Sequence, residues 1–241
     1  MIFDANTIVY MLEIIVGSLL VSVGVHFVPV GGAPAAMAQA TGIGTGTVTL
    51  AAGSGLTGLL ACGLMMRALE LSPNFATAGY NIWPILASGA IGSMIMMDAT
   101  MLTGDFIYSY AVGCPYASAK VNYDPITGFS QPPYVAPGTV GQGIPTVCFV
   151  TGTIGALLGG VGGAMIYFPC NMISHNPAQA AVFTIGIFFV QSVIPSWNIQ
   201  GTIEGFHDPK FKKWPLAYKA SLVAGILLAV MTVMIQPLGG A

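Results

Sequence analysis

The fold of this chain is decided by long apolar stretches such as residues 83–110, WPILASGAIGSMIMMDATMLTGDFIYSY. The stretch carries two acidic side chains, Asp98 and Asp105, and no Lys or Arg. A helix of about 20 apolar residues crosses the hydrocarbon core of a bilayer, whereas a strand of a membrane barrel needs only about 10. The stretch also lacks the alternation of apolar and polar residues that such a strand shows. It therefore predicts a membrane-spanning helix.

Composition extends this interpretation to the whole chain. Hydrophobic residues make up 55% of the 241 residues and charged residues only 6%, whereas a soluble domain carries about 25% charged residues. The sequence therefore predicts an all-α, polytopic membrane protein with a single membrane domain over residues 1–241. We expect the first span to be retained rather than cleaved as a signal peptide, because no Lys or Arg precedes Arg67. Six membrane-spanning helices are predicted, at about residues 7–28, 44–66, 83–110, 146–169, 178–195 and 217–236.

The positions of the few cations predict the orientation in the membrane. With six spans, loops 1, 3 and 5 share one side of the membrane and both termini share the other. The side of the termini carries Arg67 alone, and the loop side carries five lysines. Because positive charge is enriched in cytoplasmic loops, we expect a multi-pass cell-membrane protein with cytoplasmic loops 1, 3 and 5 and two extracellular termini. The five lysines are Lys120, Lys210, Lys212, Lys213 and Lys219.

Glycine spacing predicts close packing between helices. Gly155, Gly159 and Gly163 recur every four residues, which places them on one helix face that a neighbouring backbone can approach closely. The stretch 53–58, GSGLTG, matches the GxGxxG pattern of dinucleotide-binding proteins. It lies inside an apolar run with no preceding strand, so we interpret it as a second packing surface and expect no nucleotide or nucleic acid partner.

Two short segments resemble each other and suggest an internal repeat of helix hairpins. Residues 42–48, GIGTGTV, are similar to residues 141–147, GQGIPTV, and each segment opens an even-numbered span. The positive ends of both helix dipoles would then face the cytoplasm, where exposed backbone N–H groups suit an anion. Flexible starts of two ordinary helices are the alternative. The residues concerned are Gly42, Gly44, Thr45, Thr47, Gly141, Gly143 and Thr146.

Acidic side chains within the spans are the strongest functional candidates. An unpaired carboxylate at the bilayer centre costs about 2.5–3.5 kcal/mol even on the most lenient scale, so such residues usually have a role. Asp98 lies near the middle of the third span, Asp105 two turns further on, and Glu13 inside the first span. The three carboxylates would lie at successive depths across the membrane, in a graded series of oxygen ligands suited to passing a hard cation, either sodium or a proton. Asp98 is the candidate sodium ligand. The alternative is that Asp105 and Glu13 reach the membrane interface and that Asp98 is structural.

Cysteine and histidine give no metal-site pattern. The cysteines include no CxxC pair, and no histidine has a second ligand at metal spacing. We therefore interpret the cysteines as apolar packing residues and expect no zinc site. The residues are Cys62, Cys114, Cys148, Cys170, His26, His175 and His207.

Particular residue orders in the middle of the chain resemble a known family. These are residues 26–38, HFVPVGGAPAAMA, continuing into 41–47, and then residues 117–121, 124–128, 137–139 and 145–150. Together they resemble the D subunits of the membrane-bound tetrahydromethanopterin S-methyltransferase of methanogenic archaea.

This resemblance implies one subunit of a complex that transfers a methyl group from methyl-tetrahydromethanopterin, through a corrinoid, to coenzyme M, coupled to sodium export. It implies that the corrinoid and its histidine ligand belong to another subunit, so this chain alone binds no cofactor. It also implies contact with membrane subunits C and E in the ion-conducting part. No catalytic residue is carried over to this chain.

Joined with the resemblance, the residue pattern gives a hypothesis. The two glycine-rich helix starts face the methyl-transfer machinery and attract anionic coenzyme M, and Asp98 binds the translocated sodium ion. Two alternatives remain. The chain is a purely structural subunit with the ion path in a sister subunit, or it is an independent secondary ion transporter.

Overall fold

The computed structural model describes residues 5–27, 43–106, 146–199 and 214–235. Within these ranges all regular secondary structure is helical, which confirms the predicted all-α class. Each of the six long helices coincides, within a few residues, with one of the predicted spans. The helices are α1 (Ala5–Phe27), α3 (Ile43–Glu70), the short α4 (Phe75–Ala78), α5 (Ile82–Phe106), α6 (Thr146–Ser174), α7 (Pro177–Ile199) and α8 (Trp214–Ile235).

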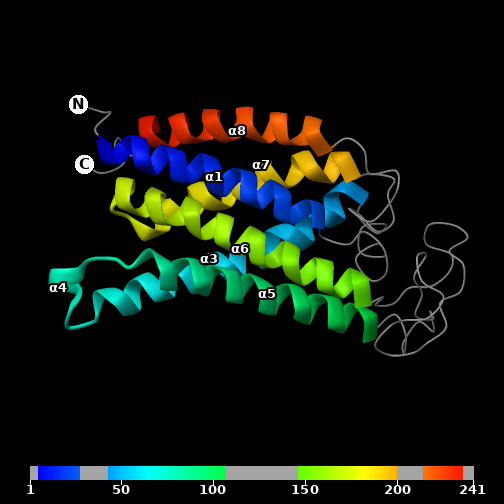
Figure 1. The fold of residues 1–241 in the computed structure, drawn as a ribbon, viewed down its shortest axis with the longest axis horizontal. Coiled ribbons are helices and arrows are strands. Elements are labelled where there is room, and N and C mark those ends of the chain that lie inside the picture. The colour runs from blue at the N-terminus through cyan, green and yellow to red at the C-terminus, as the bar shows by residue number, and fades with distance from the viewer. Residues whose placement is uncertain (1–4, 28–42, 107–145, 200–213, 236–241) are drawn as a thin grey trace, which may run out of the picture.

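The six long helices lie side by side and alternate in direction along the chain (Figure 1). α1 begins and α8 ends at the same end of the bundle, on the left of Figure 1, which we call the terminal end. α3, α6 and α8 begin at the opposite end, which we call the loop end. α6 packs against α1, α3, α5 and α7, and α7 packs against α1, α3, α6 and α8, so these two helices form the centre.

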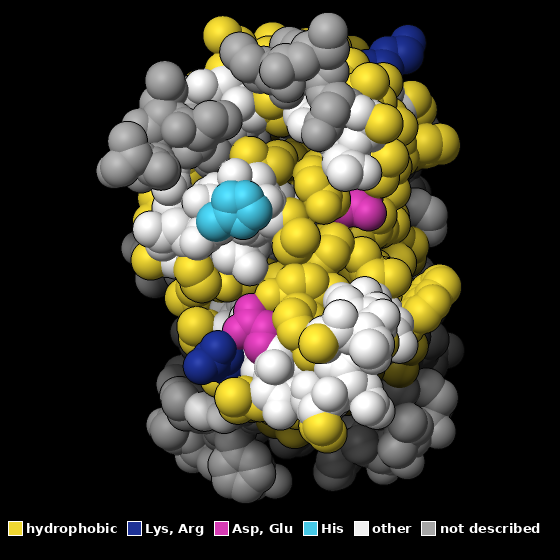
Figure 2. Space-filling view, turned by 90° about the vertical axis from the view of Figure 1, so that its left-hand side faces the viewer, with side chains coloured by type: hydrophobic (Ala, Val, Ile, Leu, Met, Phe, Trp, Pro, Cys, Tyr) yellow, Lys and Arg dark blue, Asp and Glu magenta, His cyan; other side chains and the backbone are white. Residues whose placement is uncertain are grey.

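The helices have the length and surface of membrane spans. Within the described ranges five of them are long and apolar enough to cross a bilayer, namely α1, α5, α6, α7 and α8. α3 is equally long, but the side chains of its first part lie outside what the structure describes, so it is not among these five. Large apolar side chains such as Leu64, Val182 and Leu227 are exposed, as expected of a surface in lipid. Figure 2 views the terminal end, where apolar side chains cover much of the described surface and charges are few.

Glycine allows α1 and α6 to touch backbone to backbone. A Cβ atom added at Gly17 would lie 2.6 Å from the carbonyl oxygen of Gly162 on α6. One added at Gly24 would lie 2.5 Å from that of Gly155 and 2.8 Å from the nitrogen of Gly159. Carbon atoms do not approach oxygen so closely without displacing it, so both contacts require glycine.

A second glycine contact joins three helices. Gly89 of α5 lies between Gly58 of α3 and Gly160 of α6. A Cβ at Gly58 would lie 2.6 Å from the Gly89 carbonyl oxygen, and one at Gly89 would lie 2.8 Å from the Gly160 carbonyl oxygen. Gly58 belongs to the GxGxxG match, which therefore lies within continuous helix and serves packing in the structure.

The predicted face of α6 divides between two neighbours. Gly155 lies against Gly24 of α1, as described above, while Gly163 lies against the ring of Phe188 on α7. A Cβ at Gly159 would lie 3.8 Å from the same ring. The ring also covers Gly55 of α3, so one aromatic side chain fills the space left by glycines from two helices.

The connection from α3 to α5 is fixed at the terminal end by a polar network. Arg67 and Glu70 form an ion pair with an N–O distance of 2.8 Å, and the Tyr80 hydroxyl donates to Glu70. These two hydrogen bonds hold the pKa of Glu70 below its usual value. Burial and the Glu70 carboxylate raise the pKa of Tyr80 to about 12. The Tyr80 ring packs edge-on against Phe75 of α4 and Phe168 of α6.

Candidate functional site

Asp98 reaches across the interface between α5 and α6. Its Oδ1 atom accepts a hydrogen bond of 2.6 Å from the Oγ1 hydroxyl of Thr153, which lies 55 residues later in the chain. The carboxylate is partly buried. Charged hydrogen bonds of this length are about twice as strong as neutral ones, so the pair fixes the position of the carboxylate.

The Thr153 hydroxyl has a second acceptor within reach. Its Oγ1 atom lies 3.0 Å from the carbonyl oxygen of Phe149, one turn earlier in α6. A hydroxyl group has a single hydrogen, so it satisfies the carboxylate or the carbonyl but not both fully. Rotation about one side-chain bond therefore changes which oxygen it binds and frees its lone pairs for another ligand.

The surroundings of Asp98 and Thr153 are apolar. Met97 and Met101 of α5 and Ala156 of α6 form a small buried cluster, with Met94 and Phe149 packed against it. Within the described ranges the ion pair is Arg67 with Glu70, and no Lys or Arg pairs with Asp98. The carboxylate therefore lies in a low-dielectric environment with a hydroxyl group as its hydrogen-bond partner.

Asp98 lies in the half of α5 that is nearer the loop end. The helix runs from Ile82 to Phe106, and Asp98 lies eight residues before its last residue, about 12 Å at 1.5 Å per residue. The depth of Asp98 relative to a bilayer stays a prediction.

The other two acids are not brought together with Asp98 in the described structure. Asp105 lies in α5 close to the loop end, but its side chain is outside what the structure describes. Glu13 lies on α1, which begins at the terminal end. Its Oε2 atom is buried without a hydrogen-bond partner among the described residues. The graded series of three carboxylates therefore stays a prediction.

The predicted helix starts are described only in part. Gly44, Thr45 and Thr47 lie in the first two turns of α3, and Thr146 is the first residue of α6. Both helices begin at the loop end, so their amino-terminal N–H groups face the same side of the bundle (Figure 1). The remaining predicted residues, Gly42, Gly141 and Gly143, lie outside the described residues.

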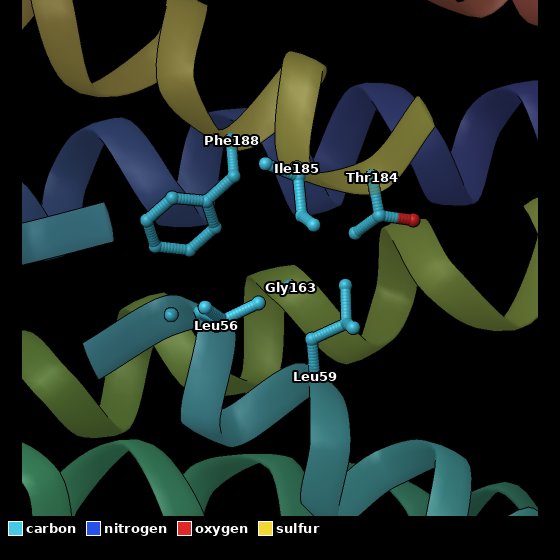
Figure 3. A pocket seen from close by; sticks show the side chains of 7 residues that line it. Leu56, Leu59, Gly163, Thr184, Ile185 and Phe188 are labelled. Atoms are coloured by element: carbon cyan, nitrogen blue, oxygen red, sulfur yellow. The ribbon is translucent and has the colours of Figure 1, made fainter. Parts of the chain in front are cut away.

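A crevice between α3, α6 and α7 offers little polar chemistry. It is lined by Leu59, Gly163, Ile185 and Phe188 among others (Figure 3). Thr184 also lines it, but its hydroxyl donates a 2.8 Å hydrogen bond to the Ala180 carbonyl of its own helix. The crevice therefore suits an apolar group and not an ion.

Sequence reasoning missed a group of neutral polar side chains between α1, α7 and α8. The Ser221 hydroxyl donates to the Ser22 hydroxyl at 2.7 Å, and Gln191 Nε2 donates to the Ser221 carbonyl at 3.1 Å. Ser18, Ser22, Gln191 and Ser221 are all fully buried. We call these four residues the polar junction. Their sequence signal is one or two neutral polar residues in each of three apolar runs, which a search for charges does not detect.

Histidine and cysteine serve packing in the described ranges. No group of three or more His, Cys, Asp or Glu side chains lies within reach of one metal ion there. His26 is fully buried, with its Nδ1 atom 2.7 Å from the Ser22 carbonyl oxygen and its ring packed against Tyr218. Cys62 and Cys170 are fully buried, in keeping with their interpretation as packing residues.

Comparison with known proteins identifies the family. The family model for the D subunit of tetrahydromethanopterin S-methyltransferase matches residues 7–225. The D subunit of that enzyme from Methanosarcina mazei is 55% identical over 98% of this chain and 97% of its own length. Those from Methanopyrus kandleri and Methanocaldococcus jannaschii are 52% and 48% identical over 93% and 95% of this chain, and 95% and 97% of their own lengths. The resemblance seen in the sequence is confirmed, and the chain belongs to the family of tetrahydromethanopterin S-methyltransferase D subunits.

Proposed function

We propose that this chain is a membrane subunit of the complex that transfers a methyl group from methyl-tetrahydromethanopterin to coenzyme M and exports sodium ions. In this proposal the chain contributes to the ion-translocating part, and Asp98 binds the sodium ion. The observation that supports it is the Asp98 carboxylate, which lies in an apolar span beside a hydroxyl group and has no cationic partner in the described ranges. Such a carboxylate is costly unless a cation compensates its charge.

The arrangement around Asp98 suits a hard cation. Sodium prefers oxygen ligands, as calcium and magnesium do, and the site offers a carboxylate, a hydroxyl and a helix carbonyl within hydrogen-bond distance of one another. When a cation reaches Asp98, the Thr153 hydroxyl turns its hydrogen to the Phe149 carbonyl and its lone pairs to the ion. Release of the ion restores the hydrogen bond to the carboxylate. Thr153 thereby acts as a positioning residue that compensates Asp98 in the ion-free state.

The loop end is the side at which we place the methyl-transfer machinery. The amino termini of α3 and α6 both face this end and would attract the anionic thiol coenzyme M. As the family resemblance implies, the corrinoid is placed on another subunit in this proposal; His26 of this chain is fully buried, with its ring against Tyr218 and its Nδ1 atom beside the Ser22 carbonyl.

The proposed setting is the cell membrane, with loops 1, 3 and 5 in the cytoplasm and both termini outside. Membrane subunits C and E are the proposed neighbours. The exposed apolar side chains on the long helices supply the surface for contact with these subunits and with lipid. A purely structural role is the second candidate. It is favoured by the same hydrogen bond, since Asp98 and Thr153 also fasten α5 to α6.

The substitution Asp98→Asn separates the two candidates. Asparagine has the same shape, and its amide oxygen still accepts the Thr153 hydrogen bond, so the complex assembles. Without the charge, sodium uptake into vesicles that contain the whole complex is expected to fall more than tenfold. Measuring methyl transfer and ²²Na uptake in the same vesicles tests this. Unchanged sodium uptake by an assembled complex would exclude Asp98 as the ion ligand and favour the structural role.

Two further substitutions serve as controls. Glu70→Gln removes a carboxylate at the terminal end that is already paired with Arg67, so transport is expected to persist. Thr153→Val removes an oxygen ligand of the bound ion and is expected to raise the sodium concentration for half-maximal transport about tenfold, which corresponds to about 1.4 kcal/mol. Thr153→Ser keeps the hydroxyl and is expected to retain the affinity of the native chain.

A further inference from the structure

The hydrogen-bonded pair of Asp98 and Thr153 lies at the surface of the bundle. Both side chains are partly exposed. α5 packs against α3 and α6 and lies at one edge of the bundle (Figure 1). The Oδ1 atom of Asp98 binds Thr153, whereas Oδ2 has no hydrogen-bond partner within the described ranges. The carboxylate therefore presents an oxygen to whatever covers α5 and α6 from outside.

The exposed side chains around the pair are apolar on both helices. On α5, Ile95 lies one turn toward the terminal end from the carboxylate and Leu102 one turn toward the loop end, and they are 62% and 50% exposed. On α6, exposed Leu157 and Val150 flank the hydroxyl in the same two directions. Residues three or four positions apart share one face of a helix. We call these four residues, together with Asp98 and Thr153, the α5–α6 face.

Lipid is a poor neighbour for the α5–α6 face. An intramembrane carboxylate normally faces a protein interior or a water-filled space, because hydrocarbon does not solvate its charge. Long side chains such as lysine reach the membrane interface instead. Aspartate is short, and exposed Leu102 and Val150 lie between Asp98 and the loop end. A protein partner that supplies polar groups therefore fits this face better than lipid does.

Charge also disfavours a second copy of this chain as the partner. A two-fold contact through the α5–α6 face would bring two Asp98 carboxylates together, and like charges at short distance destabilise each other. Within their described ranges α5 and α6 carry no Lys or Arg that could balance them. A helix from a different chain avoids this repulsion.

The number of oxygen ligands indicates what the partner contributes. Hard cations take about six oxygen ligands, and this chain offers at most four near Asp98. They are the two carboxylate oxygens, the Thr153 hydroxyl and the Phe149 carbonyl. A sodium ion and one carboxylate are already neutral together, so further charge in an apolar setting would be costly. The missing ligands are therefore neutral oxygens.

We propose that the α5–α6 face docks a membrane helix of a different subunit of the complex, which places neutral oxygen atoms opposite Asp98. Hydroxyl and amide side chains, from Ser, Thr, Asn or Gln, have this chemistry. The sodium site is then shared between two chains, and neither chain holds the ion alone. The identity of the ion rests on the proposed function, whereas the contact itself does not.

Photo-crosslinking in the intact complex tests the contact. Ile95→p-benzoylphenylalanine and Leu157→p-benzoylphenylalanine place a photoreactive group on each helix of the face. Val182→p-benzoylphenylalanine is the control, because Val182 is 70% exposed on α7, which carries no charged residue in its described range. After irradiation of native membranes, mass spectrometry is expected to find both face positions joined to a membrane helix of another subunit. Adducts with lipid alone, or with a second copy of this chain, would overturn the proposal.

The adduct also identifies the helix that carries the missing ligands. Replacing its polar residue nearest the adduct by Ala is expected to raise the sodium concentration for half-maximal ²²Na uptake about tenfold. Replacing an apolar neighbour on that helix by Ala is expected to leave it unchanged. If Asp98→Asn abolishes uptake but no polar residue of the partner helix affects its sodium dependence, the shared site is wrong. If Asp98→Asn leaves uptake unchanged, the proposed function fails, while the crosslinks still decide whether the contact exists.

Discussion

Two kinds of polar residue lie within this bundle, and the sequence reveals them unequally. Asp98 is conspicuous because a charge within an apolar run is rare. Its partner Thr153 is not, since threonine is common in membrane helices and the pair is separated by 55 residues. Ser22 and Ser221 are separated by 199 residues. A sequence therefore predicts which charged residue needs a partner, but the partner emerges only when the helices are assembled.

The network of Glu70, Arg67 and Tyr80 makes stability depend on pH. The folded-state pKa of Glu70 is lowered from 4.5, so its contribution is fully present above pH 4.5 and is lost as the pH falls through the lowered value. Tyr80 has the opposite sign. Its pKa is raised from 10 to about 12, so its contribution is present below pH 10 and is lost as the pH rises toward 12.

We expect Glu70→Gln to destabilise the fold by about 1 kcal/mol at pH 7, a modest value because both partners of the ion pair are partly exposed. Below the lowered pKa the native carboxyl is protonated and the difference disappears. Unfolding midpoints of both proteins between pH 7 and pH 3 measure this convergence. A difference that stayed constant across the range would show that the ionised carboxylate contributes nothing.

At the scale of the helices, glycine spacing was informative about packing but not about partners. The period of four residues in α6 predicted a face of Gly155, Gly159 and Gly163, and the structure places this face against both α1 and α7. Gly160 and Gly162, which do not share that period, make closer backbone contacts than Gly163 does. Spacing identifies a face of one helix, whereas the crossing angle of two helices decides which residues touch.

Gly89→Ala tests the contact of three helices. The added methyl group would lie 2.8 Å from the Gly160 carbonyl oxygen and 2.9 Å from the Ala164 Cβ atom, so α5 and α6 must separate. We expect a loss of about 1–3 kcal/mol, partly offset by the higher helix propensity of alanine. Gly186→Ala gains the same propensity without a clash and serves as the reference in thermal unfolding. Equal midpoints for the two variants would mean that the α5 to α6 contact is looser than described.

At the scale of the molecule, hydropathy sufficed for the helical class and for the alternating course of the chain. It did not give the arrangement of six helices around α6 and α7, because apolar side chains face both lipid and the interior. Exposed Val182 and buried Ile187 on the same helix illustrate this.

The predicted orientation is testable by thiol labelling. Ala76→Cys places an exposed thiol on α4 at the terminal end, and Lys212→Cys places one in the segment between α7 and α8. We expect a membrane-impermeant thiol reagent to label the first from outside intact cells and the second only in inverted vesicles. The unsubstituted chain gives the background from its own cysteines. Labelling of Ala76→Cys from the cytoplasmic side alone would reverse the orientation.

The contact of Gly58, Gly89 and Gly160 closes the space between α3, α5 and α6. Its three backbones leave no room for a single added carbon atom, and therefore none for a moving ion with its hydration shell. It lies nine residues from Asp98 along α5, about 14 Å at 1.5 Å per residue. Under the proposed function, an ion that leaves Asp98 for the terminal end would therefore be barred from the common axis of α3, α5 and α6. Its onward path would then follow the outer flank of the bundle, where a neighbouring subunit would supply the other wall.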